Sequence, residues 1–147
     1  MKKAALLLSL ACILILSASS CKRENTSLDD NSNSNSNNIS ASIQQGNWRI
    51  SLYNDSGDDH TSHFSGYSFS FTNGTITATK NGASVSGSYS SGTDDSQNKL
   101  YLNFGGTALF SELNDDWHIL EENTSIIRLE DVSGGNGGTD LLTFEKN

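Results

Sequence analysis

The stretch YSFSFTNGTITATKNGASVSGSYS, residues 67–90, decides the fold class of this chain. Its apolar residues recur at every second position, which is the period of a β-strand with one buried face. Asn73-Gly74 and Asn81-Gly82 interrupt the alternation, and Asn-Gly is the dipeptide favoured in two-residue hairpin turns. The stretch therefore predicts three consecutive antiparallel strands, over 67–72, 75–80 and 83–90.

The alternation continues on both sides of this stretch. On the N-terminal side Trp48, Ile50 and Leu52 are predicted to face inward from a strand over 48–53. On the C-terminal side four more strands are expected, around 100–104, 117–119, 127–129 and 142–144.

The segments between these strands are predicted as loops. Residues 91–98 are polar and residues 133–138 are rich in glycine, as expected of hairpin loops. Residues 107–115 break the alternation, and Leu109, Phe110 and Leu113 fit one turn of helix or a packed loop.

Eight short antiparallel strands predict an all-β protein, an eight-stranded up-and-down barrel. A sheet with one apolar face and no covering helix can hide that face by closing on itself. A β-sandwich fits the same pattern and is the structural alternative. All 12 aromatic residues follow residue 43, so the folded domain is expected to span 43–147.

The N-terminus has the pattern of a bacterial lipoprotein signal. Lys2 and Lys3 precede an apolar run over 4–16 that is too short to span a bilayer, and small residues then lead to Cys21. We expect residues 1–20 to be removed. Cys21 is the expected site of acylation, because no other group there can carry a thioether-linked lipid. A palmitate-type chain is expected among its lipids. The alternative is an ordinary secretory signal cleaved near Ser20.

Residues 21–42 are predicted to be a lipidated cysteine followed by a disordered tether. This segment is nearly all Asn, Ser and Asp after residue 24, and such a composition cannot bury enough apolar surface to offset its ordering entropy. The expected location is the cell envelope of a Gram-negative bacterium, on the outer membrane, with the leaflet left open.

The charge of the chain excludes nucleic acid as a partner. Without residues 1–20 the chain holds seven basic and 17 acidic residues, and a nucleic-acid-binding protein needs a basic face.

No cysteine besides Cys21 remains in that mature chain for a disulfide or a zinc site.

Gly46-Asn47-Trp48 opens the first strand and resembles the Gly-x-Trp motif of the lipocalin superfamily. Together with the signal, the tether and the eight-strand pattern, it makes the chain resemble small bacterial lipoproteins with a lipocalin-like domain. The resemblance implies that Trp48 closes one end of the barrel. In lipocalins an arginine near the last strand lies against this tryptophan, whereas here no arginine follows Arg128, and Lys146 is a weaker counterpart.

Aromatic residues on the inward positions are the candidate ligand-binding residues. In a roomy barrel they would line an apolar lumen, with tyrosine hydroxyls as polar anchors for a small apolar ligand, and in a solid barrel they would fill it. The candidates are Trp48, Tyr67, Phe69, Phe71, Tyr89, Phe104 and Trp117.

We expect no cofactor, no metal and no catalytic residues. Asp58, His60 and His63 are weak metal candidates, because the segment that holds them also has the composition of a solvated loop. No Gly-x-Ser-x-Gly elbow occurs, and no enzyme activity is expected.

Two non-enzymatic functions follow from this sequence. The first is a membrane-anchored barrel that binds a small apolar ligand, with an open mouth near residues 54–66. The second is a solid barrel that acts on a protein partner, as a hydrolase inhibitor or an envelope-stress factor, and an acidic surface would suit a cationic partner. The identity of that partner is left open.

Overall fold

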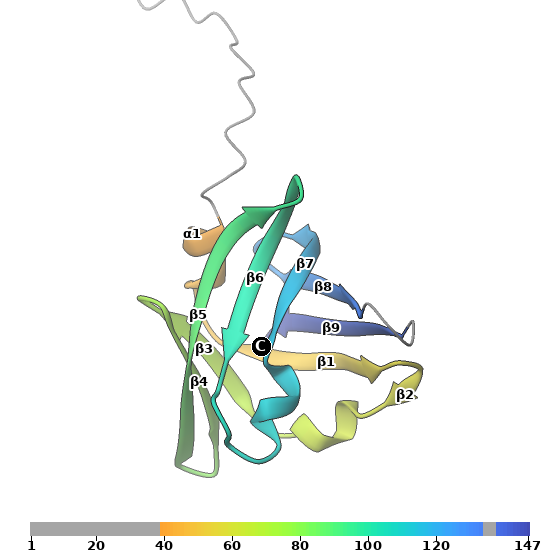
Figure 1. Cartoon of the computed structure of the whole chain (residues 1–147). Helices are drawn as coiled ribbons and strands as arrows, with labels where there is room; N and C mark the ends of the chain where they lie inside the picture. Colours follow the sequence, from red (N-terminus) through yellow and green to blue (C-terminus); the bar gives the residue numbers. More distant parts are fainter. Residues whose placement is uncertain (1–38, 134–137) are drawn as a thin grey trace, which may run out of the picture. The chain divides into compact units, whose positions relative to one another are not determined.

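The computed structural model describes residues 39–133 and 138–147, and its regular structure is almost entirely β (Figure 1). The strands of these two ranges are β1 (Trp48–Asp55), β2 (Asp58–Asp59), β3 (Ser68–Thr72), β4 (Thr75–Lys80), β5 (Ala83–Asp94), β6 (Gln97–Asn103), β7 (Asp115–Glu122), β8 (Ile126–Val132) and β9 (Thr139–Lys146). The helical segments are α1 (Ile39–Ile43) and two 3-10 turns, η1 (Thr61–Phe64) and η2 (Phe110–Leu113). Within the described ranges no helix has the length and apolar character needed to cross a membrane.

Eight of the strands form a closed antiparallel up-and-down barrel. The sheet runs from β1 through β3 to β9 in chain order, and β1 pairs with β9 through six residue pairs, which closes it. β2 is an additional two-residue strand paired with the end of β1. The predicted barrel is therefore confirmed, and the β-sandwich alternative does not apply.

The two Asn-Gly turns form as predicted. Asn73 and Gly74 have φ values of 48° and 80°, and Asn81 and Gly82 have 52° and 81°. A two-residue turn with positive φ at both positions matches the right-handed twist of the strands it joins. These turns set the registers of β3 against β4 and of β4 against β5.

The predicted polar loop over Ser91–Asn98 is wrong. β5 continues to Asp94 and β6 begins at Gln97, so only Asp95 and Ser96 form the turn, with φ values of 47° and 64°. This end of the hairpin carries mostly exposed or partly exposed polar side chains, so no apolar alternation marks it. Its strands are held by backbone hydrogen bonds, which do not depend on the side chains.

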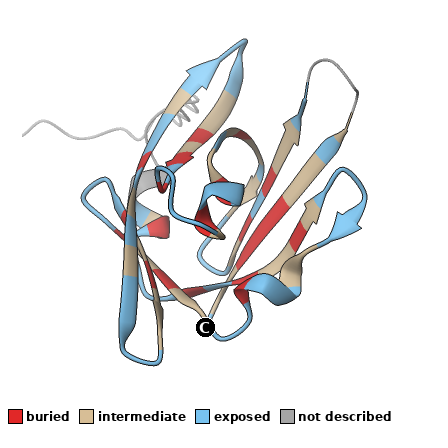
Figure 2. Ribbon diagram, turned by 60° about the horizontal axis from the view of Figure 1, so that its bottom comes forward, coloured by how far each residue is buried: buried red, intermediate tan, exposed pale blue. Residues whose placement is uncertain are grey.

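The core lies on the inward faces of the strands. Figure 2 shows buried positions as separate bands along the ribbon, with more exposed positions between them. Phe69 and Phe71 of β3 and Ile76 and Ala78 of β4 are all buried, while their neighbours along each strand are more exposed. This alternation is what the sequence predicts for β3 and β4.

The expected inward position of Leu52 is wrong, because β1 contains a bulge. Ile50 is buried, Leu52 is half-buried, and Tyr53 is the next residue with its side chain in the core. The register with β9 shifts between Ile50 and Leu52, so one extra residue is inserted on β1. Because side chains alternate faces, one inserted residue turns the following residues to the opposite face.

Short helical segments accept hydrogen bonds from both tryptophans. The Trp48 indole N–H donates to the Ile43 carbonyl of α1 over 2.9 Å, and the Trp117 indole N–H donates to the Leu113 carbonyl of η2 over 3.0 Å. The helical turn expected within 107–115 is thus confirmed as η2. Lys146 Nζ lies 5.8 Å from the centre of the Trp48 ring, a cation–π contact.

The last residues of the predicted tether, 39–42, form α1 together with Ile43. Ile43 is fully buried in the core, and the Ser42 hydroxyl donates to the Glu122 carboxylate. The rest of the predicted tether, the predicted signal peptide, Cys21 and residues 134–137 of the predicted glycine-rich loop lie outside the described residues.

Candidate functional site

The seven aromatic residues predicted for the lumen all belong to the hydrophobic core of the barrel or pack against it. Six of them are buried and Tyr67 is half-buried against the cluster. Their places are Trp48 on β1, Tyr67 just before β3, Phe69 and Phe71 on β3, Tyr89 on β5, Phe104 just after β6 and Trp117 on β7.

These rings pack against one another and against three further phenylalanines, of which Phe64 of η1 has its ring centre 6.4 Å from that of Phe69. Phe144 of β9 meets Phe69 and Phe71 edge to face, with ring centres 5.5 and 5.6 Å apart. Phe110 of η2 meets Tyr67 and Phe104, each with ring centres 5.1 Å apart. Such close aromatic contacts stabilise the interior and occupy its space. Phe64, Phe110 and Phe144 are buried interior residues that are not among the predicted lumen residues.

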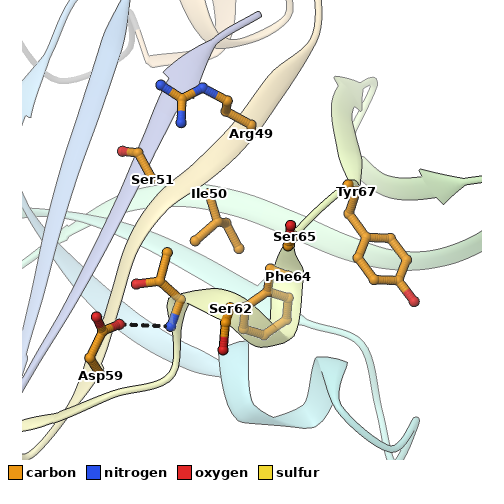
Figure 3. Close-up of a pocket in the computed structure, with 10 residues that line it drawn as sticks. Arg49, Ile50, Ser51, Asp59, Ser62, Phe64, Ser65 and Tyr67 are labelled. Atoms are coloured by element: carbon orange, nitrogen blue, oxygen red, sulfur yellow. Dashed lines mark hydrogen bonds between the residues drawn. The ribbon is translucent and has the colours of Figure 1, made fainter.

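A surface hollow of about 480 Å³ lies between β1 and the η1 segment (Figure 3). It arises because β1 pairs with β3 through a single residue pair, Trp48 with Phe69, after which the two strands diverge. Residues 59–67 fill part of the gap. The lining residues are Arg49, Ile50, Ser51, Asp59, Thr61, Ser62, Phe64, Ser65, Gly66 and Tyr67.

The η1 segment is held to the edge of β1 by hydrogen bonds. The Tyr53 backbone N–H donates to Thr61 Oγ1 over 2.8 Å, and the His60 N–H donates to the Tyr53 carbonyl over 2.9 Å. The Thr61 N–H donates to Asp59 Oδ1 over 2.9 Å, and hydrogen bonding to Thr61 lowers the pKa of the Asp59 carboxyl. Phe64 is buried below these contacts, which anchors the turn in the core.

Carboxylates gather at the end of the barrel where β1 and β8 finish and β7 and β9 begin. Asp55 pairs with Asp58 across β1 and β2, and Asp131 pairs with Asp140 across β8 and β9. We call this region the acidic end. Its residues are Asp55, Asp58, Asp59, Glu112, Asp115, Asp116, Asp131 and Asp140.

The negative charges of the acidic end affect the pKa of Tyr53. Its hydroxyl donates to the Glu112 carbonyl over 2.8 Å. Burial, followed by the charges of Asp55, Glu112, Asp140 and Asp115, raises the pKa of Tyr53 to about 12. The pKa of Asp115 is also raised, chiefly by burial and further by Asp131. A negative potential of this kind favours cations and basic partners.

The basic residues of the domain are mostly engaged elsewhere. Residues 39–147 hold five Lys or Arg against 14 Asp or Glu. Arg49 pairs with Glu145, and Arg128 Nη1 lies 2.7 Å from Glu121 Oε2. Lys99 Nζ lies 3.6 Å from Asp116 Oδ2 at the margin of the acidic end, which leaves most of its carboxylates without a basic partner among the described residues.

Two of the three weak metal candidates come together in the structure. The rings of His60 and His63 have centres 4.8 Å apart, and His63 Nδ1 lies 3.4 Å from Glu112 Oε2. The ligand atoms of His60, His63 and Glu112 all lie within 4.8 Å of one another. Asp58 lies on β2 with an exposed side chain and outside this group. Glu112 has no motif around it that could have singled it out, because it follows His63 by 49 residues.

Comparisons with protein families, with curated proteins and with solved structures found no match to this chain. The functional assignment therefore depends on the residues and their geometry.

Proposed function

We propose that this chain is a non-enzymatic lipoprotein of the bacterial cell envelope, lipid-anchored through Cys21, whose lipocalin-like barrel recognises a protein partner. The observation that carries the proposal is the aromatic packing inside the barrel. Because Phe110 and Phe144 pack among the seven candidate lumen residues, the interior supports a solid scaffold. Recognition is then a property of the surface.

The acidic end is the surface that we propose for this recognition. It combines carboxylates from five strands and from η2. Burial and the charges of four of these carboxylates together raise the pKa of Tyr53. A cationic partner would be drawn to this end by long-range attraction, so its association should weaken as the ionic strength rises. A basic hydrolase that the protein inhibits, or a basic factor of the envelope-stress response, fits this description.

A small apolar ligand is the second candidate function, and the hollow beside η1 favours it. Its volume of about 480 Å³ falls in the range of small-molecule sites. Tyr67 supplies apolar surface beside the buried Ile50 and Phe64, and Arg49 supplies a polar anchor (Figure 3). The hollow also lies beside residues 54–66, where the sequence predicts the mouth of a ligand site.

Capture from a Gram-negative envelope extract tests the partner proposal. We would immobilise the full chain, the double variant Asp55→Asn/Asp58→Asn at the acidic end, and the matched control Asp94→Asn/Asp95→Asn on the β5–β6 hairpin. We expect a basic protein to be retained by the wild type and the control, and lost from the acidic-end variant and at high salt. Equal retention by all three proteins would contradict a role for the acidic end.

Native mass spectrometry of the full chain, purified gently from its host, separates the two functions. A bare polypeptide mass, apart from the lipid on Cys21, supports the solid barrel. A stoichiometric small-molecule adduct that disappears in the variant Tyr67→Ala would instead support the ligand site beside η1.

A further inference from the structure

Two 3-10 turns from distant parts of the chain meet at the acidic end. η1 carries His63 and is preceded by His60, and η2 carries Glu112. In Figure 1 these turns lie at the same end of the barrel, below β1. Their contact brings two imidazoles and one carboxylate within 4.8 Å of one another.

The spacing of the two histidines suits a 3-10 turn. Such a turn has three residues per turn, so side chains at positions i and i+3 lie one above the other. The His63 backbone N–H donates to the His60 carbonyl over 3.0 Å, which closes the turn between them. Both imidazoles are consequently presented on one side of η1, toward Glu112.

Tyr53 contacts residues of both turns. Its ring contacts His60 edge to face with ring centres 6.2 Å apart, its backbone carbonyl accepts from the His60 N–H, and its hydroxyl donates to the Glu112 carbonyl. Supporting contacts of this kind fix the positions from which metal ligands project. The backbone that carries His60, His63 and Glu112 is therefore held in position without a bound ion.

We propose that His60, His63 and Glu112 bind a divalent transition-metal ion of the zinc class. Two imidazole nitrogens and one carboxylate oxygen form a ligand set that suits zinc and its neighbours in the first transition series. The charges of Asp55, Asp115 and Asp140 nearby strengthen the attraction for a cation. His63 and Glu112 have side chains 43% and 39% exposed, so an ion has access and keeps positions for water or for a group of a partner.

A comparable histidine–carboxylate pair has no third metal-binding side chain beside it among the residues that the structure describes. His118 of β7 lies beside Glu130 of β8, with 3.8 Å between His118 Nδ1 and Glu130 Oε1. A second group, Asp115, Asp116 and Asp131, offers oxygen atoms alone. Oxygen-only sites suit calcium or magnesium, so the choice of metal distinguishes the two groups.

Calorimetric titration with Zn²⁺ alone tests the site. The protein is the full chain in mild detergent with Cys12→Ser and Cys21→Ser, so that no thiol competes for the ion. We expect one Zn²⁺ per chain. We expect His60→Gln, His63→Ala and Glu112→Gln each to weaken the affinity by about tenfold or more, since even supporting residues of metal sites have effects of that size. His118→Ala should leave it unchanged.

Co²⁺ absorption and circular dichroism complete the test. Tetrahedral or five-coordinate Co²⁺ bands in the wild type that are lost in His63→Ala support nitrogen coordination at this site, and unchanged circular dichroism shows that the variant is folded. Absence of Zn²⁺ binding overturns the proposal. It is also overturned if Asp131→Asn abolishes binding while His63→Ala does not, because the ion would then occupy the oxygen-only group.

Discussion

Tyr53 is the residue that connects the core with the acidic end. Its ring is buried, with 3% of the residue exposed, and packs against Phe64 with ring centres 5.6 Å apart. Its hydroxyl donates to the Glu112 carbonyl, at the end where the carboxylates gather. Because burial and these charges oppose the phenolate, folding and phenol ionisation are thermodynamically linked at this residue.

We predict that the stability of the protein falls as the pH rises from about 10 to about 12, the interval between the unfolded and folded pKa values of Tyr53. Below this interval the phenol is protonated in both states. Within it the unfolded chain loses the proton while the folded chain retains it, so the unfolded state is favoured. Urea unfolding followed by circular dichroism over a series of pH values measures the effect.

The variant Tyr53→Phe isolates this contribution. Near neutral pH it should lose about 1 kcal/mol of stability, because it lacks the hydrogen bond to the Glu112 carbonyl. Above pH ~10 its stability should fall less steeply than that of the wild type. The assignment to Tyr53 fails if both proteins decline with the same slope.

β5 shows how one element accommodates a crowded interior. Gly87 lies between Val85 and Tyr89 on the inward face of the strand and pairs with Ile76 of β4. A Cβ atom at this position would lie 2.6 Å from the Asn103 carbonyl oxygen and 2.8 Å from the Phe104 ring. The glycine is needed because the next strand and a buried ring occupy the space of a side chain.

We predict that Gly87→Ala destabilises the protein by about 1–3 kcal/mol, the usual cost of adding a group to a packed core. The matched control is Gly106→Ala, because a Cβ atom there has no neighbour within 4 Å. The control should change stability by less than about 0.5 kcal/mol. Denaturant midpoints of the three proteins measure both values, and a stable Gly87→Ala protein would show that the Asn103 backbone and the Phe104 ring can both move aside.

At the scale of the whole molecule, the proposed function needs the barrel to be held at a membrane. The apolar run over 4–16 and the small residues before Cys21 carry that proposal, and they lie outside the described residues. Each CH₂ of an acyl chain buried in a bilayer contributes ~0.8 kcal/mol, so two or more chains on one cysteine give stable attachment.

We predict that Cys21→Ser releases the protein from membranes when it is produced in a Gram-negative host. Fractionation by centrifugation followed by intact-mass measurement shows both the location and the lipid. The matched control is Cys12→Ser, which removes a thiol from the signal peptide and should leave the protein in the membrane pellet. A Cys21→Ser protein that still pellets with membranes would contradict lipid anchoring.

The barrel could be predicted because its strands are specified locally. Alternating side chains in β3 and β4 and the Asn-Gly turns after them act between residues close in the chain, and the structure confirms them. The same local pattern fails at Ser91–Asn98, where backbone pairing continues without an apolar face. It fails again at Leu52, where pairing with β9 inserts a residue that the strand's own sequence does not reveal.

The amino-acid sequence by itself determined the all-β class, the strand order and the aromatic character of the interior, because these follow from side-chain period and turn chemistry. Tertiary structure alone decided that Phe110 and Phe144 fill that interior, that β1 and β3 diverge to leave a hollow, and that Glu112 meets His63. Each of these contacts joins residues far apart in the chain. These residues come close in space because the sheet closes into a barrel, and no local sequence pattern encodes that closure.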